Sequence, residues 1–173
     1  VLIAGVEKLS DLHQSAAIDV LATASDSHYE SFQGLTLAGI YAMITRQYMS
    51  KFDVSHEDLA AWPVLMHEHG YHNPYAQIRR KITKRDVLDS VLIADPIRLL
   101  DCCSMGDGAA AVIITSENRL ECTRDRCVEV IGMGSATSTF TLHERPDLVS
   151  LPATIYAAKK AYSMAKISPT DVH

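Results

Sequence analysis

The chain has 173 residues, of which 47% are hydrophobic and 21% charged, so it can bury a core and is not a disordered tail. Sixteen basic residues against twenty-one acidic ones give a net charge of −5, which argues against a general binder of nucleic-acid phosphates. No apolar run reaches the roughly 20 residues that span a bilayer, so we predict no membrane segment.

The four cysteines lie unevenly in one quarter of the chain, at Cys102, Cys103, Cys122 and Cys127. This spacing is unlike the disulfide framework of a small secreted protein. We therefore predict a reducing, cytoplasmic location.

Residues 1–6 are short and continuously apolar, which is typical of a strand buried on both faces of a sheet. Such strands lie in the middle of α/β sheets, so we expect the chain to begin partway through a domain of a larger protein. Residues 10–33 are polar and without a clear period, and they predict a loop-rich segment.

Apolar residues then recur at helical spacing and predict an amphipathic helix over residues 36–51. Two later apolar runs, residues 109–115 and 127–132, are expected to form buried strands. Pro152 is well placed for the first turn of a helix that extends to about residue 166. Because the expected strands are separated by helical material, the pattern predicts an α/β fold with parallel strands.

Two capping patterns mark helix starts between these elements: Ser55 with Asp58, and Thr83 with Asp86. The first opens a helix that Gly70 is expected to end. Pro63 lies inside that helix and should kink it or shift its start. The second precedes a short helical turn.

Three histidines lie close together, at His67, His69 and His72, with Glu68 between them. Positions two apart do not share a helix face, so convergence on a metal ion is disfavoured. A solvated helix end, or one histidine hydrogen-bonded to a loop, is the preferred interpretation, and we assign no metal site.

Two further patterns give weak signals for chemistry. Adjacent Cys102 and Cys103 cannot easily chelate one zinc ion, and neither a histidine nor a helix N-terminus stands nearby in the sequence to activate a thiolate. Small core residues are the alternative. Gly132 and Gly134 follow an expected strand as in a dinucleotide-binding turn, but the helix that should begin at once does not.

Several segments in order resemble the thiolase family. Residues 4–10 resemble its G-[GV]-x-E-x-[ML]-S stretch, and residues 101–111 resemble the S/C-x-x-D-G-A-A-A block before the last strand of its N-terminal half. Residues 72–77 and 94–100 are similar to the archaeal and sterol-carrier-protein-type branch, as is the ending over residues 147–162. The resemblance covers essentially the whole chain.

The resemblance implies a fold of two similar βαβαβαββ halves packed as a five-layer αβαβα sandwich. Residues 1–8 are then expected to be a strand of the N-terminal half, and residues 9–108 an inserted loop region. Residues 109–125 are expected to form the last strand of that half with a connector. Residues 126–173 are expected to begin the C-terminal half.

The resemblance also implies an acyl-CoA:acetyl-CoA C-acyltransferase, most specifically an acetyl-CoA acetyltransferase. Members of the family form a cysteine thioester and then carry out Claisen condensation or thiolysis, with coenzyme A thioesters as substrates and no further cofactor. In the family the nucleophilic cysteine lies upstream of the segment at residues 4–10. The family's catalytic histidine lies downstream of this chain. His173 matches the stretch just before that histidine's motif and is therefore not assigned as the catalytic residue. We therefore assign no catalytic residue here and expect the chain alone to be inactive.

The resemblance places part of the coenzyme A site in this chain. Cys103 aligns with a serine that contacts the pantetheine arm in other thiolases, and Ser104 is next to it. Tyr41 falls where the loop helix would face the pantetheine tunnel, with a core tyrosine as the alternative. The basic run at residues 79–81 would reach the coenzyme A phosphates or, as the preferred interpretation, form a solvated charge run.

Two other functions remain open at this point. One is a non-catalytic thiolase-like scaffold for another acyl-CoA enzyme, and the other is a condensing enzyme of the same superfamily. The expected partners are acyl-CoA and acetyl-CoA, a second copy of the chain and other acyl-CoA enzymes, but neither nucleic acid nor a membrane. Self-association is expected because a part of such a fold exposes sheet edges and apolar faces.

Overall fold

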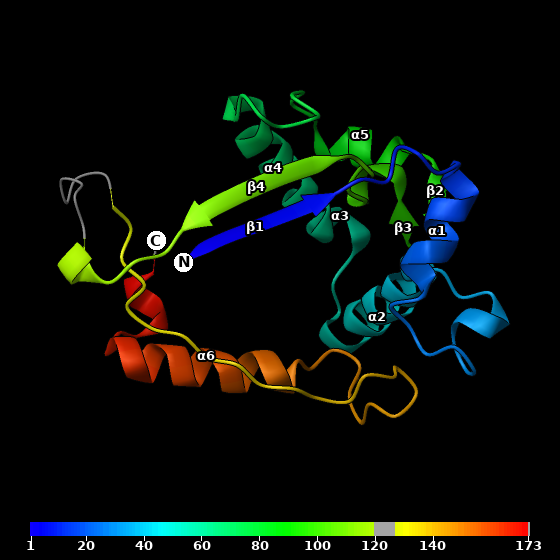
Figure 1. Ribbon diagram of the computed structural model, residues 1–173. Helices are drawn as coiled ribbons and strands as arrows, with labels where there is room; N and C mark the ends of the chain where they lie inside the picture. The colour runs from blue at the N-terminus through cyan, green and yellow to red at the C-terminus, as the bar shows by residue number, and fades with distance from the viewer. Residues whose placement is uncertain (120–126, 173) are drawn as a thin grey trace. The chain divides into compact units, whose positions relative to one another are not determined.

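The computed structural model describes residues 1–119 and 127–172, which form helices and short strands (Figure 1). The chain divides into two compact units. Unit 1 contains Val1–Val6, Ala109–Thr139 and Ser150–His173, and unit 2 contains Glu7–Gly108 and Phe140–Val149. The assignments made above for Cys122, for His173 and for the end of the predicted connector fall outside the described residues.

The helices are α1 (Gln14–Ala22), α2 (Leu37–Phe52), α3 (His56–Leu59), α4 (Ala61–His72), α5 (Lys84–Asp89) and α6 (Pro152–Ala165). The strands are β1 (Leu2–Glu7), β2 (Leu92–Ala94), β3 (Ile97–Arg98) and β4 (Gly108–Ile113). Short 3₁₀ helices cover Ser31–Gln33, Leu99–Asp101, Glu117–Arg119 and Pro169–Asp171. None of the helices in the described ranges is both long and apolar enough to cross a membrane.

In unit 1 the predicted first strand is present as β1, and it pairs with β4 in a two-stranded sheet. The two arrows run in opposite directions in Figure 1. At the end of the pair the Val1 amino group donates to the Ile114 carbonyl (2.6 Å), and the Ile114 N–H donates to the Val1 carbonyl (2.8 Å). The predicted parallel arrangement is therefore wrong for this pair. The long connection between the strands allows either direction, so spacing alone could not fix it.

Every residue of β1 and β4 is exposed. The prediction that residues 1–6 are buried on both faces is therefore wrong for this structure. The apolar run does form a strand. Within the described residues, however, its sheet contains only two strands, and a sheet of this size cannot bury its own side chains.

The predicted strand at residues 127–132 is also wrong, because this segment is irregular. It runs alongside α6 as the yellow trace in Figure 1. A Cβ atom on Gly132 would overlap the Ala161 carbonyl oxygen, and one on Gly134 would overlap the Ala157 carbonyl oxygen. The two glycines thus allow close packing against a helix. Their spacing, which resembled a dinucleotide-binding turn, has this structural explanation.

In unit 2 the helix predicted at residues 36–51 is confirmed as α2. Thr36 accepts a hydrogen bond from the Gly39 N–H, and Asp53 ends the helix in the left-handed conformation at φ 52°. The helix contacts α1 and the β2–β3 hairpin, in which the Asp95–Pro96 peptide bond is cis. The hairpin was not predicted, because its strands are only three and two residues long.

Both predicted capping boxes are confirmed, at the starts of α3 and α5. Pro63 shifts the helix start as expected, since α3 ends at Leu59 and α4 begins anew at Ala61. Gly70 does not end α4, which continues to His72. The helix stops before Asn73-Pro74, because a proline disfavours the helical conformation of the residue that precedes it.

The core of unit 2 is an apolar cluster formed between these capped helices. Ala60 and Val87 are fully buried and Ile82 is 7% exposed, and together they form one apolar cluster. Val64, Leu88 and Leu100 pack against it. Because Leu100 belongs to the 3₁₀ helix at Leu99–Asp101, the core supports the start of the segment that leads into β4.

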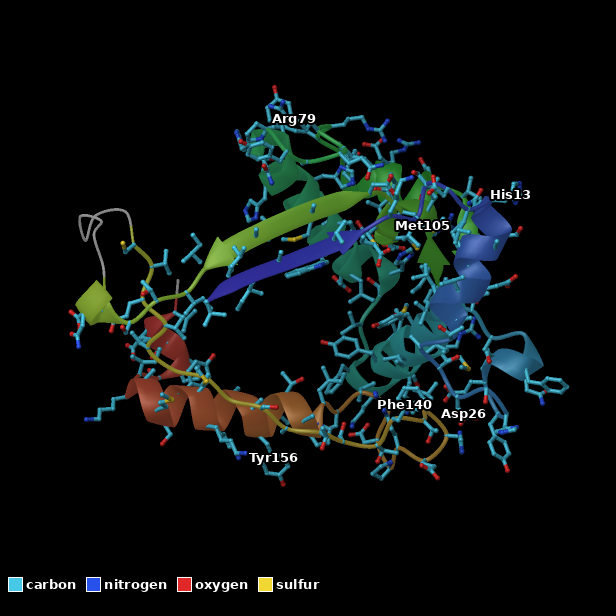
Figure 2. All side chains as sticks on the ribbon, in the orientation of Figure 1. His13, Asp26, Arg79, Met105, Phe140 and Tyr156 are labelled. Carbon is cyan, nitrogen blue, oxygen red and sulfur yellow. The ribbon has the colours of Figure 1, made fainter. Side chains whose placement is uncertain are left out.

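The loop-rich prediction for residues 10–33 is wrong in part, because α1 forms there. The rest of this stretch is fixed by Glu30, which is 4% exposed. Its carboxylate accepts hydrogen bonds from the Asp26 N–H (2.9 Å) and the Leu142 N–H (2.5 Å). Glu30 thereby joins Phe140–Val149 to unit 2, and Figure 2 labels Asp26 and Phe140 in the two connected stretches.

Candidate functional site

The candidate site is built on residues 101–108, here called the 101–108 segment, which leads from the Leu99–Asp101 turn into β4. It contains Cys103 and Ser104, and both are exposed. Met105 lies at its centre and is labelled in Figure 2. Side chains from three distant parts of unit 2 hold the segment in place.

The start of the segment is fixed by His56 and Asp101. The His56 Nε2 and Asp101 Oδ2 atoms are 2.9 Å apart, and the two side chains are 17% and 16% exposed. Asp101 also accepts a hydrogen bond from the Arg98 N–H (2.9 Å). Arg98 in turn donates to the Ser90 carbonyl (2.6 Å). This largely buried polar network anchors the segment to α3 and to the turn after α5.

The end of the segment is fixed by Asp107. Its carboxylate accepts hydrogen bonds from the Leu9 N–H (2.9 Å), the Ser10 N–H (2.9 Å) and the Ser10 hydroxyl (2.5 Å). The Ser10 hydroxyl, the Ser10 N–H and the Leu9 N–H lower the pKa of Asp107 below its ordinary value of 3.8, because they stabilise the charged form. The carboxylate therefore joins the residues after β1 to those before β4.

The middle of the segment is held by Gln77. The Ser104 hydroxyl donates to Gln77 Oε1 (3.2 Å), and Gln77 Nε2 donates to the Met105 carbonyl (3.4 Å). Gly106 lies so close that a Cβ atom there would overlap Oε1. One side-chain amide thus contacts three consecutive residues.

Cys102, the first cysteine of the segment, is a poor nucleophile in this setting. Burial raises the pKa of the Cys102 thiol, and the charges of Asp101 and Cys103 raise it further. The thiolate, which is the reactive form, is therefore disfavoured. Cys102 and Cys103 are free thiols, whereas Cys127 is disulfide-bonded. That no catalytic residue lies in this chain stays a prediction.

Tyr41 lies on α2, and its side chain is 60% exposed. The alternative that it is a core tyrosine is therefore wrong. In the described part of the chain Tyr41 makes no hydrogen bond to Cys103 or Ser104, so the structure does not join the three predicted residues into one cluster. Its predicted contact with coenzyme A stays a prediction.

The histidine-rich stretch has a structural role at the end of α4. His67 Nδ1 lies 2.8 Å from the Arg80 carbonyl, as expected for a histidine hydrogen-bonded to a loop. Glu68 pairs with Lys81 (2.5 Å) and lies 3.8 Å from His72. Over residues 1–119 and 127–172, no three metal-ligating side chains are grouped closely enough to hold an ion.

The basic run is engaged with the same helix. Arg79 reaches the Tyr71 carbonyl (3.4 Å), and Lys81 pairs with Glu68 as described above. Arg79, Arg80 and Lys81 are all exposed. These contacts favour the solvated charge run over a phosphate site.

A small hollow borders the 101–108 segment on the side of α1. Its volume is about 260 Å³, and its apolar lining comes from Leu9, Leu12, Ala17 and Met105. Pockets that enclose a ligand measure roughly 300–1,000 Å³. The hollow is therefore too small to enclose a molecule the size of coenzyme A.

Comparison with known proteins confirms the resemblance predicted from the sequence. The chain is 40% identical over 172 residues to "Acetyl-CoA acetyltransferase" of Methanothermobacter thermautotrophicus, covering 99% of the chain and 44% of the relative. It is 30% identical over 184 residues to "Sterol carrier protein 2" of Gallus gallus, covering 99% of the chain and 34% of the relative. The chain thus spans less than half the length of both relatives, and no family model matches it.

A solved structure supports the fold. The "Ltp2-ChsH2(DUF35) aldolase" superposes with a TM-score of 0.72 at 24% identity, covering 99% of this chain and 46% of that one. At this level of identity the similarity establishes a shared arrangement of helices and strands.

Proposed function

We propose that this chain is part of a thiolase, an acyl-CoA:acetyl-CoA C-acyltransferase, and most specifically of an acetyl-CoA acetyltransferase. The observation that carries the proposal is the 40% identity to an acetyl-CoA acetyltransferase over 99% of the chain. In the parent protein the chain would contribute to a five-layer αβαβα sandwich. The nucleophilic cysteine and the catalytic histidine would lie outside residues 1–173.

The reaction we propose has two steps. In the cleavage direction a cysteine thiolate attacks the keto carbonyl of a 3-ketoacyl-CoA, the bond between the α and β carbons breaks, and acetyl-CoA leaves as an enolate that takes up a proton. The thiolate of free coenzyme A then attacks the enzyme thioester and releases the shortened acyl-CoA. Each step is easier than a direct displacement, and an oxyanion hole stabilises the charge that develops on oxygen.

The role we propose for this chain is to bind the coenzyme A moiety. Cys103 and Ser104 are exposed on the 101–108 segment. The two ends of this segment are fixed by the contacts of Asp101 and Asp107. A hydroxyl is a stronger hydrogen-bonding group than a thiol, so Ser104 is expected to provide the main polar contact with pantetheine. Tyr41 is proposed as an additional contact from α2.

The proposal extends to the setting of the protein. Acyl-CoA and acetyl-CoA are the substrates, and no cofactor is required. We further propose that the parent is a homo-oligomer, because the fully exposed β1–β4 sheet offers apolar surface for association.

Thiolysis of acetoacetyl-CoA tests this function. The full-length parent should consume acetoacetyl-CoA in the presence of free coenzyme A and produce acetyl-CoA. The reaction is monitored by the loss of absorbance of the substrate enolate. Residues 1–173 alone should give no turnover. A parent that binds coenzyme A without turnover would favour the scaffold alternative, and a parent that neither binds nor cleaves would contradict both.

A further inference from the structure

The amide of Gln77 has a defined orientation against the 101–108 segment. The Met105 carbonyl oxygen can only accept a hydrogen bond, so the amide group 3.4 Å from it must be the donor Nε2. The carbonyl Oε1 is thereby placed 3.2 Å from the Ser104 hydroxyl. The contact with Met105 therefore determines which end of the amide faces Ser104.

This orientation decides what Ser104 can offer to a ligand. A serine hydroxyl has one hydrogen to donate and two lone pairs with which to accept. Because the hydrogen points to Gln77 Oε1, the lone pairs remain for a second partner. A ligand group that contacts Ser104 Oγ must then be a donor, such as an amide N–H.

Gly106 is the third part of the arrangement. A Cβ atom at this position would overlap Gln77 Oε1 and lie 3.1 Å from Cδ. An alanine there would displace the amide and break its hydrogen bonds to Ser104 and Met105. The hydrogen bonds of the Gln77 amide therefore require a glycine at position 106.

We propose that Gln77 is a positioning residue that holds the Ser104 hydroxyl and the backbone of residues 104–106 in place for an N–H group of the pantetheine arm. This inference rests on the proposed function for its ligand. His56 and Ser10 fix the two ends of the same segment, and Gln77 fixes the part that would face the ligand.

The test uses two single variants and their combination in the full-length parent. Gln77→Ala should raise the KM for coenzyme A about fivefold, which corresponds to one net hydrogen bond, and should change kcat less than about twofold. Gly106→Ala should have the same effect because it displaces the same amide. The double variant should be no worse than either single variant, since coupled sites are not additive. Gln33→Ala, at an exposed glutamine, is the matched control and should leave the KM unchanged.

An unchanged KM in Gln77→Ala, or effects that multiply in the double variant, would overturn the positioning role. Backbone amide exchange of residues 104–107 provides a second readout that needs no turnover. Exchange should be faster in both single variants than in the parent and the Gln33→Ala control, and equal rates would overturn the role. A wild-type parent that neither binds coenzyme A nor turns over would contradict the proposed function, and the exchange rates would then decide the positioning role separately.

Discussion

Replacing Gly134 by alanine is expected to lower the free energy of unfolding by about 2–3 kcal/mol, the upper part of the range for overpacking. The added Cβ atom would overlap the Ala157 carbonyl oxygen and lie 3.1 Å from the Ala161 backbone nitrogen. Both are backbone atoms of α6, so no side-chain rotation can relieve the overlap. The segment must instead move away from the helix, which would also strain the hydrogen bond from Lys160 to the Ser135 carbonyl.

The urea concentration at the midpoint of unfolding measures this effect. Gly5→Ala is the matched control, because a Cβ atom there meets nothing within 4 Å. That substitution should leave the midpoint unchanged or raise it slightly, since alanine restricts the unfolded chain. Equal midpoints for Gly134→Ala and Gly5→Ala would show that residues 127–139 do not pack on α6 as described.

Replacing Asp107 by asparagine is expected to destabilise the protein at neutral pH and to have little effect in acid. The folded protein lowers the pKa of Asp107, chiefly through the Ser10 hydroxyl, so the ionised carboxylate stabilises the folded state. This contribution is complete above the unfolded-state pKa, near the ordinary value of 3.8. It is lost as the pH falls through the lower pKa of the folded state.

The measurement compares the urea midpoints of Asp107→Asn and of the unchanged protein at pH 7 and below pH 3. The difference between the two midpoints should be greatest at pH 7 and shrink in acid. The other carboxylates are the same in both proteins, so their titration does not affect this difference. Asp19→Asn, at an exposed position on α1, serves as the control and should show no such convergence. A difference that stays constant with pH would contradict the role given to the Asp107 carboxylate.

The parts of the fold that were predicted correctly depend on local signals. The capping boxes at Ser55 and Thr83 each involve residues three positions apart, and both helices begin where they indicate. The proline at position 152 likewise marks the start of α6. Such signals act within one turn of helix, so the sequence contains all the information they need.

The parts that were predicted wrongly depend mainly on contacts between residues far apart in the sequence. Residues 127–132 have the composition of a strand, but they contact α6 and do not enter a sheet. The direction of β4 against β1 is decided by the pairing of residues over 100 positions apart. α1 was missed because its N-terminus has no side-chain cap and its surroundings are polar. None of these outcomes is encoded within a short window of sequence.

The candidate site shows the same division. Cys103, Ser104 and Tyr41 were identified by resemblance to a family and not by any local chemical pattern. The residues that position the segment were missed, because His56 is 45 positions from Asp101 and Gln77 is 27 from Ser104. Gln77 did lie in one of the family-like segments, but that resemblance gave no indication of its contact with Ser104.

The proposed cysteine-thioester mechanism is tested most directly by locating the acyl group on the enzyme. The full-length parent is incubated with acetyl-CoA and digested, and its peptides are analysed by mass spectrometry for an acetyl group on cysteine. A thioester is expected on one cysteine outside residues 1–173, with Cys102 and Cys103 unmodified. An acetyl group on either of these two residues, or the absence of any acetylated cysteine, would contradict it.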